Sequence, residues 1–131
     1  MSRRNSGFTV LELLIAIVFL VVAGTIFFLQ KRDLEVAARD SLRKTDINSI
    51  YYNLEEVFYP TNKAYPEHLV IDQLKGIDPE ALKDPYGKTI GQEGSNYRYE
   101  PKDCVNGLCK TYNLTADLEY EADVVKGNRT H

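Results

Sequence analysis

Residues 7–29 read Gly-Phe-Thr-Val-Leu-Glu-Leu-Leu-Ile-Ala-Ile-Val-Phe-Leu-Val-Val-Ala-Gly-Thr-Ile-Phe-Phe-Leu, and Glu12 is the single charged residue among them. The run from Phe8 to Leu29 has 22 residues. As an α-helix it would extend about 33 Å at about 1.5 Å per residue, which is enough to cross a bilayer. The run stops at Gln30-Lys31-Arg32-Asp33. We therefore expect residues 8–29 to form a membrane-spanning helix.

The short polar and basic segment before this run, residues 1–7, invites comparison with a secretory signal peptide. A signal peptide has a shorter apolar stretch, of about 7–15 residues, and a cleavage site with small residues after that stretch. Here the apolar run is longer and ends in the bulky residues 27–30. The small residue at the break in composition is Gly7, in front of the run. Cleavage after Gly7 would remove the leader and keep the membrane helix.

Glu12 is unusual in an apolar helix, because a carboxylate near the centre of a bilayer costs about 3 kcal/mol. One interpretation is that Glu12 lies at a shallow depth and reaches water at the headgroups. The other is that it pairs with a cation. Cleavage after Gly7 would create an amino group on Phe8, one helical turn away. In a row of stacked helices, Glu12 of one chain would then pair with Phe8 of its neighbour and set the register.

The segment Gly7-Phe8-Thr9-Val10-Leu11-Glu12-Leu13-Leu14-Ile15 resembles the class III signal of type IV prepilins and pseudopilins. The resemblance implies cleavage between Gly7 and Phe8 by a prepilin peptidase, N-methylation of Phe8, and assembly through Phe8 and Glu12. Many pilins carry a proline late in the apolar run, where the helix melts in the filament. This chain has no proline there, and Gly24 is the one weak point in the helix.

The same resemblance implies where the protein acts and with what. The chain would wait in the bacterial inner (cytoplasmic) membrane and then enter an extracellular homo-oligomeric filament. Its further partners would be the motor and platform proteins of pilus assembly. A pseudopilin of a type II secretion system or a competence pilus subunit is an alternative within the same fold. A membrane-anchored binding domain that never polymerises is the alternative from another class.

Residues 30–59 contain no glycine or proline, and they are expected to continue the helix until Pro60 ends it. Their apolar residues recur mostly three or four apart, which indicates an amphipathic helix. They are Leu34, Ala38, Leu42, Ile47, Ile50, Leu54, Val57 and Phe58. From Ile47 onward we expect this stripe to pack on the chain's own sheet. The part near Leu34 is expected to contact neighbouring subunits.

Residues 60–131 are expected to form a small globular head. Its first part is a connector with a short helix at Glu67–Leu74 and a second one capped by Asp78. The sequence Asp84-Pro85-Tyr86-Gly87 predicts a turn. The tail Lys126–His131 is expected to be mobile.

Two strands are predicted in the second part of the head. In residues Asn96–Glu100, tyrosines alternate with polar residues, so both tyrosine side chains are expected on the same face of a strand. In residues Tyr112–Tyr120, apolar and polar side chains alternate strictly, so one face is expected to lie on the helix. The predicted fold class is therefore α+β, in which a long N-terminal helix carries a small antiparallel sheet on its second half. This order of elements also resembles the pilin family.

Cys104 and Cys109 flank a short segment that contains Asn106-Gly107, a pair that favours a tight hairpin. Two cysteines cannot supply a four-ligand zinc site. Their spacing and the preceding membrane segment together predict a disulfide that closes the turn, which implies an oxidising, extracytoplasmic location.

The sequence offers no catalytic constellation. His68 and His131 are far apart, and motifs such as a nucleophile elbow or a phosphate-binding loop are missing. The net charge of −3 argues against a general nucleic-acid binder. Calcium is the one cofactor that the sequence raises, because acidic residues alternate near the C-terminus: Asp117, Glu119, Glu121 and Asp123, with Asp84 and Asp103 elsewhere. Alternate strand residues lie about 7 Å apart and do not converge on an ion by themselves, so no metal is expected, with calcium binding as the alternative.

Overall fold

The computed structural model describes residues 7–130 of the chain. It begins with α1 (Val10–Tyr52), which passes directly into the π-helical turn η1 (Asn53–Phe58) and the short helix α2 (Tyr59–Asn62). By its internal contacts the chain divides into two compact units at Glu35/Val36. The second unit contains the later part of the helix and all the strands.

The helix ends three residues later than Pro60 led us to expect. Pro60 lies in the first turn of α2, where a backbone N–H is not required, so the ring does not interrupt the hydrogen bonding. The chain instead leaves the helix at Lys63, which has a positive φ of 55° and donates its N–H to the carbonyl of Tyr59.

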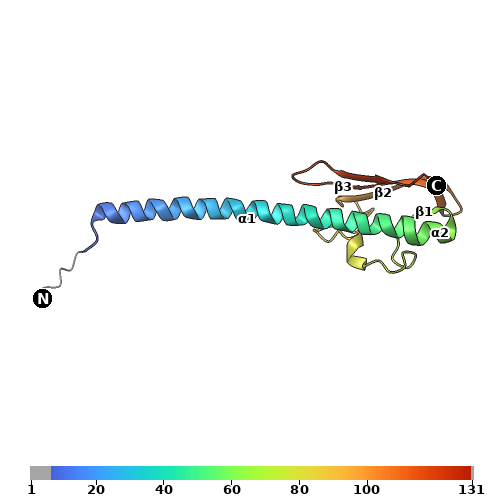
Figure 1. Ribbon diagram of the computed structural model, residues 1–131, viewed down its shortest axis with the longest axis horizontal. Coiled ribbons are helices and arrows are strands. Elements are labelled where there is room, and N and C mark those ends of the chain that lie inside the picture. Colours follow the sequence, from blue (N-terminus) through green and yellow to red (C-terminus); the bar gives the residue numbers. More distant parts are fainter. Residues whose placement is uncertain (1–6, 131) are drawn as a thin grey trace. The chain divides into compact units, whose positions relative to one another are not determined.

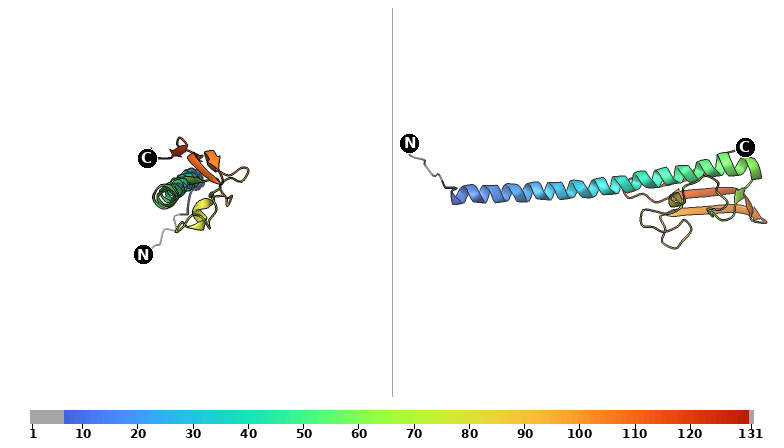
Figure 2. Two further views of the ribbon diagram at one scale, coloured as in Figure 1. Left: turned by 90° about the vertical axis from the view of Figure 1, so that its right-hand side faces the viewer. Right: turned by 90° about the horizontal axis from the view of Figure 1, so that it is seen from below.

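The strands form one antiparallel sheet with β3 at its centre. Their bounds are β1 (Tyr65–Pro66), β2 (Tyr97–Val105), β3 (Leu108–Ala116) and β4 (Val124–Gly127). One edge of β3 pairs with β2 along its whole length. The other edge of β3 pairs with two short strands, with β1 near Cys109 and with β4 near Thr115. The sheet covers one flank of the second half of the helix, and the loop that carries the 3-10 helix η2 (Pro79–Leu82) covers another (Figure 1, Figure 2).

Several local predictions are confirmed. Asp78 caps η2, since its carboxylate accepts the N–H of Glu80 at 3.0 Å. Asn106 and Gly107 form the two-residue turn between β2 and β3, with φ of 52° and 79°, as a type I′ hairpin requires. Residues 84–87 form the expected turn, closed by a 2.8 Å hydrogen bond from the N–H of Gly87 to the carbonyl of Asp84.

Other local predictions are wrong. Residues 67–74 form turns rather than a helix, because so short a segment is only marginally helical without a packed face, and of its side chains Leu74 alone is fully buried. The final long strand stops at Ala116, so Leu118 and Tyr120 lie beyond it. The start of the expected mobile tail belongs to β4, where Lys126 pairs with Leu114.

The core lies between the helix and the sheet. It consists of Ile47, Ile50, Leu54, Tyr65, Leu74, Leu82, Ile90, Tyr97, Tyr112, Leu114 and Ala116. The helix residues in this set confirm that the stripe from Ile47 onward packs on the sheet. Val57, at its end, remains 43 % exposed. The observed α+β fold is therefore the predicted one, held by a core in which tyrosines fill much of the volume.

We predict that Leu54→Ala destabilises the full-length protein by about 2–5 kcal/mol, because Leu54 is fully buried and its truncation leaves a cavity. Urea unfolding in detergent micelles, followed by tyrosine fluorescence, measures the change. Leu42→Ala is the matched control, since Leu42 is 49 % exposed and its loss should cost no more than about 0.5 kcal/mol. Equal losses in both variants would contradict the assignment of the core.

Candidate functional site

The apolar part of α1 is the most conspicuous surface of the first unit. All its large hydrophobic side chains from Val10 to Leu29 are about half or more exposed. By length and composition the helix Val10–Asn62 could cross a membrane, and no residue of its most apolar window is buried. A helix that is apolar all round needs lipid or other apolar helices as its surroundings. This segment is therefore the candidate functional site.

The N-terminus of this helix is closed by a capping box. The N–H of Glu12 donates to Thr9 Oγ1 at 3.2 Å, and the N–H of Thr9 donates to Glu12 Oε2 at 3.4 Å. Two backbone donors that a helix start leaves without partners are satisfied in this way. Gly7 and Phe8 precede the helix and are exposed. The predicted cleavage bond thus lies in non-helical backbone, two residues before the first helical residue.

Glu12 has two structural properties that bear on its predicted role. Its side chain is hydrogen-bonded to the helix start, so the carboxylate lies at the same end of the helix as Phe8, which precedes it by four residues. The capping hydrogen bond satisfies a backbone donor but supplies no positive charge. The remaining leader, residues 1–6, lies outside the described residues.

Gly24 does not interrupt the helix, which is continuous through this position. A β-carbon added at Gly24 would meet no neighbouring atom. The adjacent Thr25 donates its hydroxyl to the carbonyls of Val21, at 2.5 Å, and Val22, at 3.1 Å. Such bonds let a hydroxyl sit in an apolar helix without water, and they also weaken the local helical hydrogen bonds.

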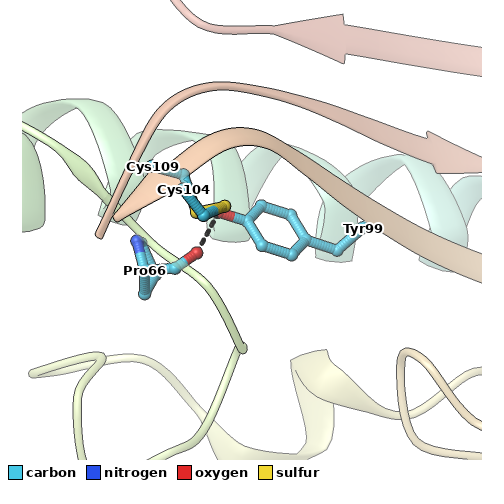
Figure 3. Close-up of a disulfide and its surroundings, with 4 residues drawn as sticks. All are labelled: Pro66, Tyr99, Cys104 and Cys109. Atoms are coloured by element: carbon cyan, nitrogen blue, oxygen red, sulfur yellow. Dashed lines mark hydrogen bonds between the residues drawn. A yellow bond between two sulfur atoms is a disulfide. The ribbon is translucent and has the colours of Figure 1, made fainter. Parts of the chain in front are cut away.

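The predicted disulfide is present. Cys104 and Cys109 face each other across the β2–β3 hairpin, with Cα atoms 3.9 Å apart, and no free cysteine occurs in the described chain. Figure 3 shows Tyr99 beside the bridge, with its hydroxyl donating to the carbonyl of Pro66 at 2.7 Å. Because Pro66 belongs to β1, this contact and the pairing of Tyr65 with Cys109 fix the chain just after the helix to the hairpin.

In the second unit, charged residues of α1 face the sheet side of the molecule. Arg43 is 1 % exposed and donates to Asp40, at 2.7 Å, and to Glu119, at 2.8 Å. Arg39 holds the same Glu119 carboxylate through two hydrogen bonds of 2.8 Å. Asp40 in turn accepts the backbone N–H groups of Glu119 and Tyr120. This network, which we call the polar latch, fastens the segment after β3 to the helix.

Two further buried carboxylates lie along the same face. Asp46 accepts the hydroxyl of Tyr97 at 2.8 Å. Glu55, 2 % exposed, accepts the hydroxyls of Tyr65 and Tyr112 and the backbone N–H of Arg129. The π-helical turn places Asn53, Leu54 and Glu55 in succession on the buried side. Helix, sheet and C-terminal segment are thus joined by hydrogen bonds that need fixed geometry.

Burial and partners act in opposite directions on these groups. Burial opposes ionisation of Asp40, but the N–H donors of Glu119 and Tyr120 together with Arg43 outweigh it and lower its pKa. The hydrogen bonds from Arg39, against a smaller effect of burial and with help from Arg43, lower the pKa of Glu119 to about 2. Burial raises the pKa of Asp46, and the hydrogen bond from Tyr97 only partly offsets it.

Three of the six acidic residues considered for calcium are paired with cations. Asp117 binds Arg98 through two hydrogen bonds, Glu119 belongs to the polar latch, and Glu121 pairs with Lys44. Among residues 7–130 no group of three or more His, Cys, Asp or Glu side chains is placed to hold a metal ion. The carboxylate of Asp84 accepts hydrogen bonds from the backbone N–H groups of Tyr86, Lys88 and Asn96, and so stabilises the loop that follows it.

The polar latch was missed by sequence reasoning, although the sequence carries a signal for it. The apolar stripe predicted for the helix steps by five residues between Leu42 and Ile47, which breaks the helical period. Arg43 lies four residues before Ile47, and Asp40 lies three residues before Arg43, so both continue the buried face at helical spacing. The buried face therefore changes from apolar to charged toward the N-terminus, and Leu42 lies on the exposed side.

In comparisons with known proteins, no family model, no curated protein and no solved structure matches this chain. A long apolar N-terminal helix, a small antiparallel sheet and a disulfide are together compatible with a pilin-like fold.

We predict that Glu119→Gln reduces the dependence of stability on pH in acid. The lowered pKa of Glu119 means that its contribution is fully present above its ordinary value of 4.5 and is lost as pH falls toward about 2. The variant lacks this contribution, so its free energy of unfolding should fall less steeply over that range. Unfolding in urea at a series of pH values measures the slope.

Asp46→Asn supplies a control of opposite sign. The raised pKa of Asp46 makes its contribution most favourable at low pH, and the contribution is lost as pH rises through the folded value. Relative to the wild type, this variant should therefore gain stability as pH rises. Parallel pH curves for the wild type and Glu119→Gln would show that the polar latch does not hold Glu119 ionised.

Proposed function

We propose that this chain is a structural subunit of a type IV pilus or a closely related extracellular filament. In this proposal the prepilin is inserted in the inner membrane, cleaved after Gly7 and polymerised through its N-terminal helix. The observation that carries the proposal is the exposed apolar segment of α1, headed by Thr9 and Glu12 and continuous with the helix that carries the sheet.

The charge of Glu12 favours a filament over a simple anchor. An anchor needs only about 20 apolar residues, and a carboxylate within them is a cost of up to about 3 kcal/mol. The capping box uses this side chain at the helix start, yet it leaves the negative charge without a counter-ion among its hydrogen-bond partners. After cleavage, the amino group of a neighbour's Phe8 would supply that counter-ion and make the assembled state more stable than the lone chain.

The helix length supports the same proposal. From Val10 to Asn62 the helix has 53 residues, or about 80 Å at about 1.5 Å per residue. Only residues from Asp40 onward are fully buried against their own sheet and loops. The remaining helical surface has no partner of sufficient size within the described chain, and a bundle of such helices would cover it.

The first test is the intact mass of the protein from cells with an active prepilin peptidase. The proposal predicts a chain that begins at Phe8 and carries one extra methyl group, recovered from filaments sheared off the cell surface. A chain that still begins at Met1 and stays in the membrane fraction would rule the proposal out.

The second test separates the charge of Glu12 from its capping role. Glu12→Gln removes the charge, but a glutamine can still accept the N–H of Thr9, whereas Glu12→Ala removes both. If charge pairing drives assembly, both variants should lower filament yield about tenfold or more, equivalent to about 1.4 kcal/mol, with membrane insertion unchanged. Full assembly by Glu12→Gln would assign Glu12 a capping role only. Full assembly by both variants would show that filament assembly does not depend on Glu12.

A further inference from the structure

A groove in the second unit runs along the helix from Leu42 to Val57. It consists of two adjoining hollows of about 480 and 490 Å³, which share Ser49, Asp78 and Ala81. The helix forms one wall, and the loop with η2 forms the other. Over 15 residue steps the groove is about 22 Å long, at about 1.5 Å per residue.

On the helix wall of this groove, the exposed side chains of the first three turns are uncharged, and the one charged helix residue that lines them, Asp46, is buried. It presents Leu42, Thr45, Ser49 and Tyr52, and of these Leu42 and Tyr52 are 49 % and 57 % exposed. The hydroxyls of Thr45 and Ser49 already donate to backbone carbonyls one turn earlier, at 3.0 and 2.9 Å. Their donors need no water, so this wall can be covered at a low desolvation cost. An ordinary surface helix has the reverse pattern, with its charges outward.

The rim of the groove is acidic. Four acidic residues line its first hollow, of which Asp78 and Glu80 are exposed and Asp46 and Asp84 are buried, and Lys83 is the single cation in this lining. Lys83 pairs with Glu80 at 2.7 Å, whereas within residues 7–130 the Tyr97 hydroxyl is the one hydrogen-bond partner of the Asp46 side chain. The neighbouring negative charge of Asp78 adds to the effect of burial on the pKa of Asp46. A ligand with an apolar body and a positive end would match this surface.

The chain itself contains such a segment, outside this unit. Ile26, Phe27, Phe28 and Leu29 are 52–71 % exposed, and Lys31 and Arg32 follow within one turn. Lys31 has one weak and exposed contact, with Glu35 at 3.8 Å. A groove on one part of a chain and its complement on another part form a head-to-tail contact. Repeated between copies, such a contact generates an open polymer wherever its rotation does not close into a ring.

We propose that this groove binds the helix segment Ile26–Arg32 of a second copy of the chain. The apolar side chains would lie against Leu42, Ser49 and Tyr52, and Lys31 and Arg32 would face the acidic rim at Glu80. In this binding mode a helix lies in a groove. The fit of the apolar side chains provides affinity, and the charged residues fix the position of the helix along the groove. This inference rests on the proposed function and names the contact that positions each head on its neighbour.

A charge exchange tests the contact in cells that make wild-type filaments. Glu80→Lys and Arg32→Glu should each lower filament yield about tenfold, and the double variant should recover most of it, because the pair is restored with reversed signs. Leader cleavage and the amount of membrane-inserted protein are measured alongside and should not change. Glu93→Lys is the matched control, since Glu93 is exposed and does not line the groove.

A photo-crosslinking amino acid at Leu42 provides the second measurement. In filaments, mass spectrometry should place the crosslink within residues 26–32 of another copy. The inference is overturned if the single variants behave like Glu93→Lys, if the double variant is no better than the worse single one, or if the crosslink maps elsewhere or to a different protein.

The two proposals fail in distinguishable ways. Filaments that assemble through Glu12 but tolerate every groove variant would overturn the groove contact alone. A wild-type chain that reaches the membrane, forms no filaments and gives no crosslink between copies would overturn both.

Discussion

One constraint dominates this molecule: a single helix has two surfaces that require different surroundings. The side chains of Val10–Leu29 are apolar on every side and exposed, whereas from Asp40 onward one side of the helix is buried against the sheet. Because no proline interrupts α1, the backbone hydrogen bonds carry through from one environment to the other. The fold of the second unit can be satisfied within one chain. The apolar surface of the first cannot, so any account of function has to say what covers it.

The second unit is held to its helix by a mixed contact. Ile47, Ile50 and Leu54 supply ordinary apolar packing, which has little directional preference. The polar latch and the buried Glu55 add bonds that form in one geometry only. Buried charge pairs are weak evidence for stability as such, because desolvation offsets much of the attraction between the charges. Here their effect is to fix the register of helix against sheet, so that the exposed side of the helix, with Leu42 and Tyr52, is presented in a defined orientation.

The features predictable from sequence were those encoded by local chemistry. The apolar run, the Asn106-Gly107 hairpin, the Cys104–Cys109 bridge and the Asp78 cap each depend on residues close together in the chain. The wrong predictions about the strands involve distant partners. β4 consists of four residues whose strand character comes from pairing with β3, and the apparent alternation of residues 112–120 continues past the point where pairing stops. The burial of Asp40 and Arg43 was not predicted, because charged residues are seldom fully buried. The one sequence signal for it is the break in the helical spacing of the apolar residues.

The reversed polarity of the helix explains how one chain could serve both as a stable head and as a unit of assembly. Several charged side chains of the helix form ion pairs and hydrogen bonds with the chain's own sheet and C-terminal segment. The outer side of the helix is instead occupied by Leu42, Thr45, Ser49 and Tyr52. Loss of outward charge lowers the cost of covering this surface with another helix. The acidic rim at Asp78 and Glu80 then favours a partner that carries positive charge beside its apolar residues. The position of the charged residues on the helix therefore has two effects. It fastens the helix to its own sheet, and it leaves an uncharged outer side that another helix can cover.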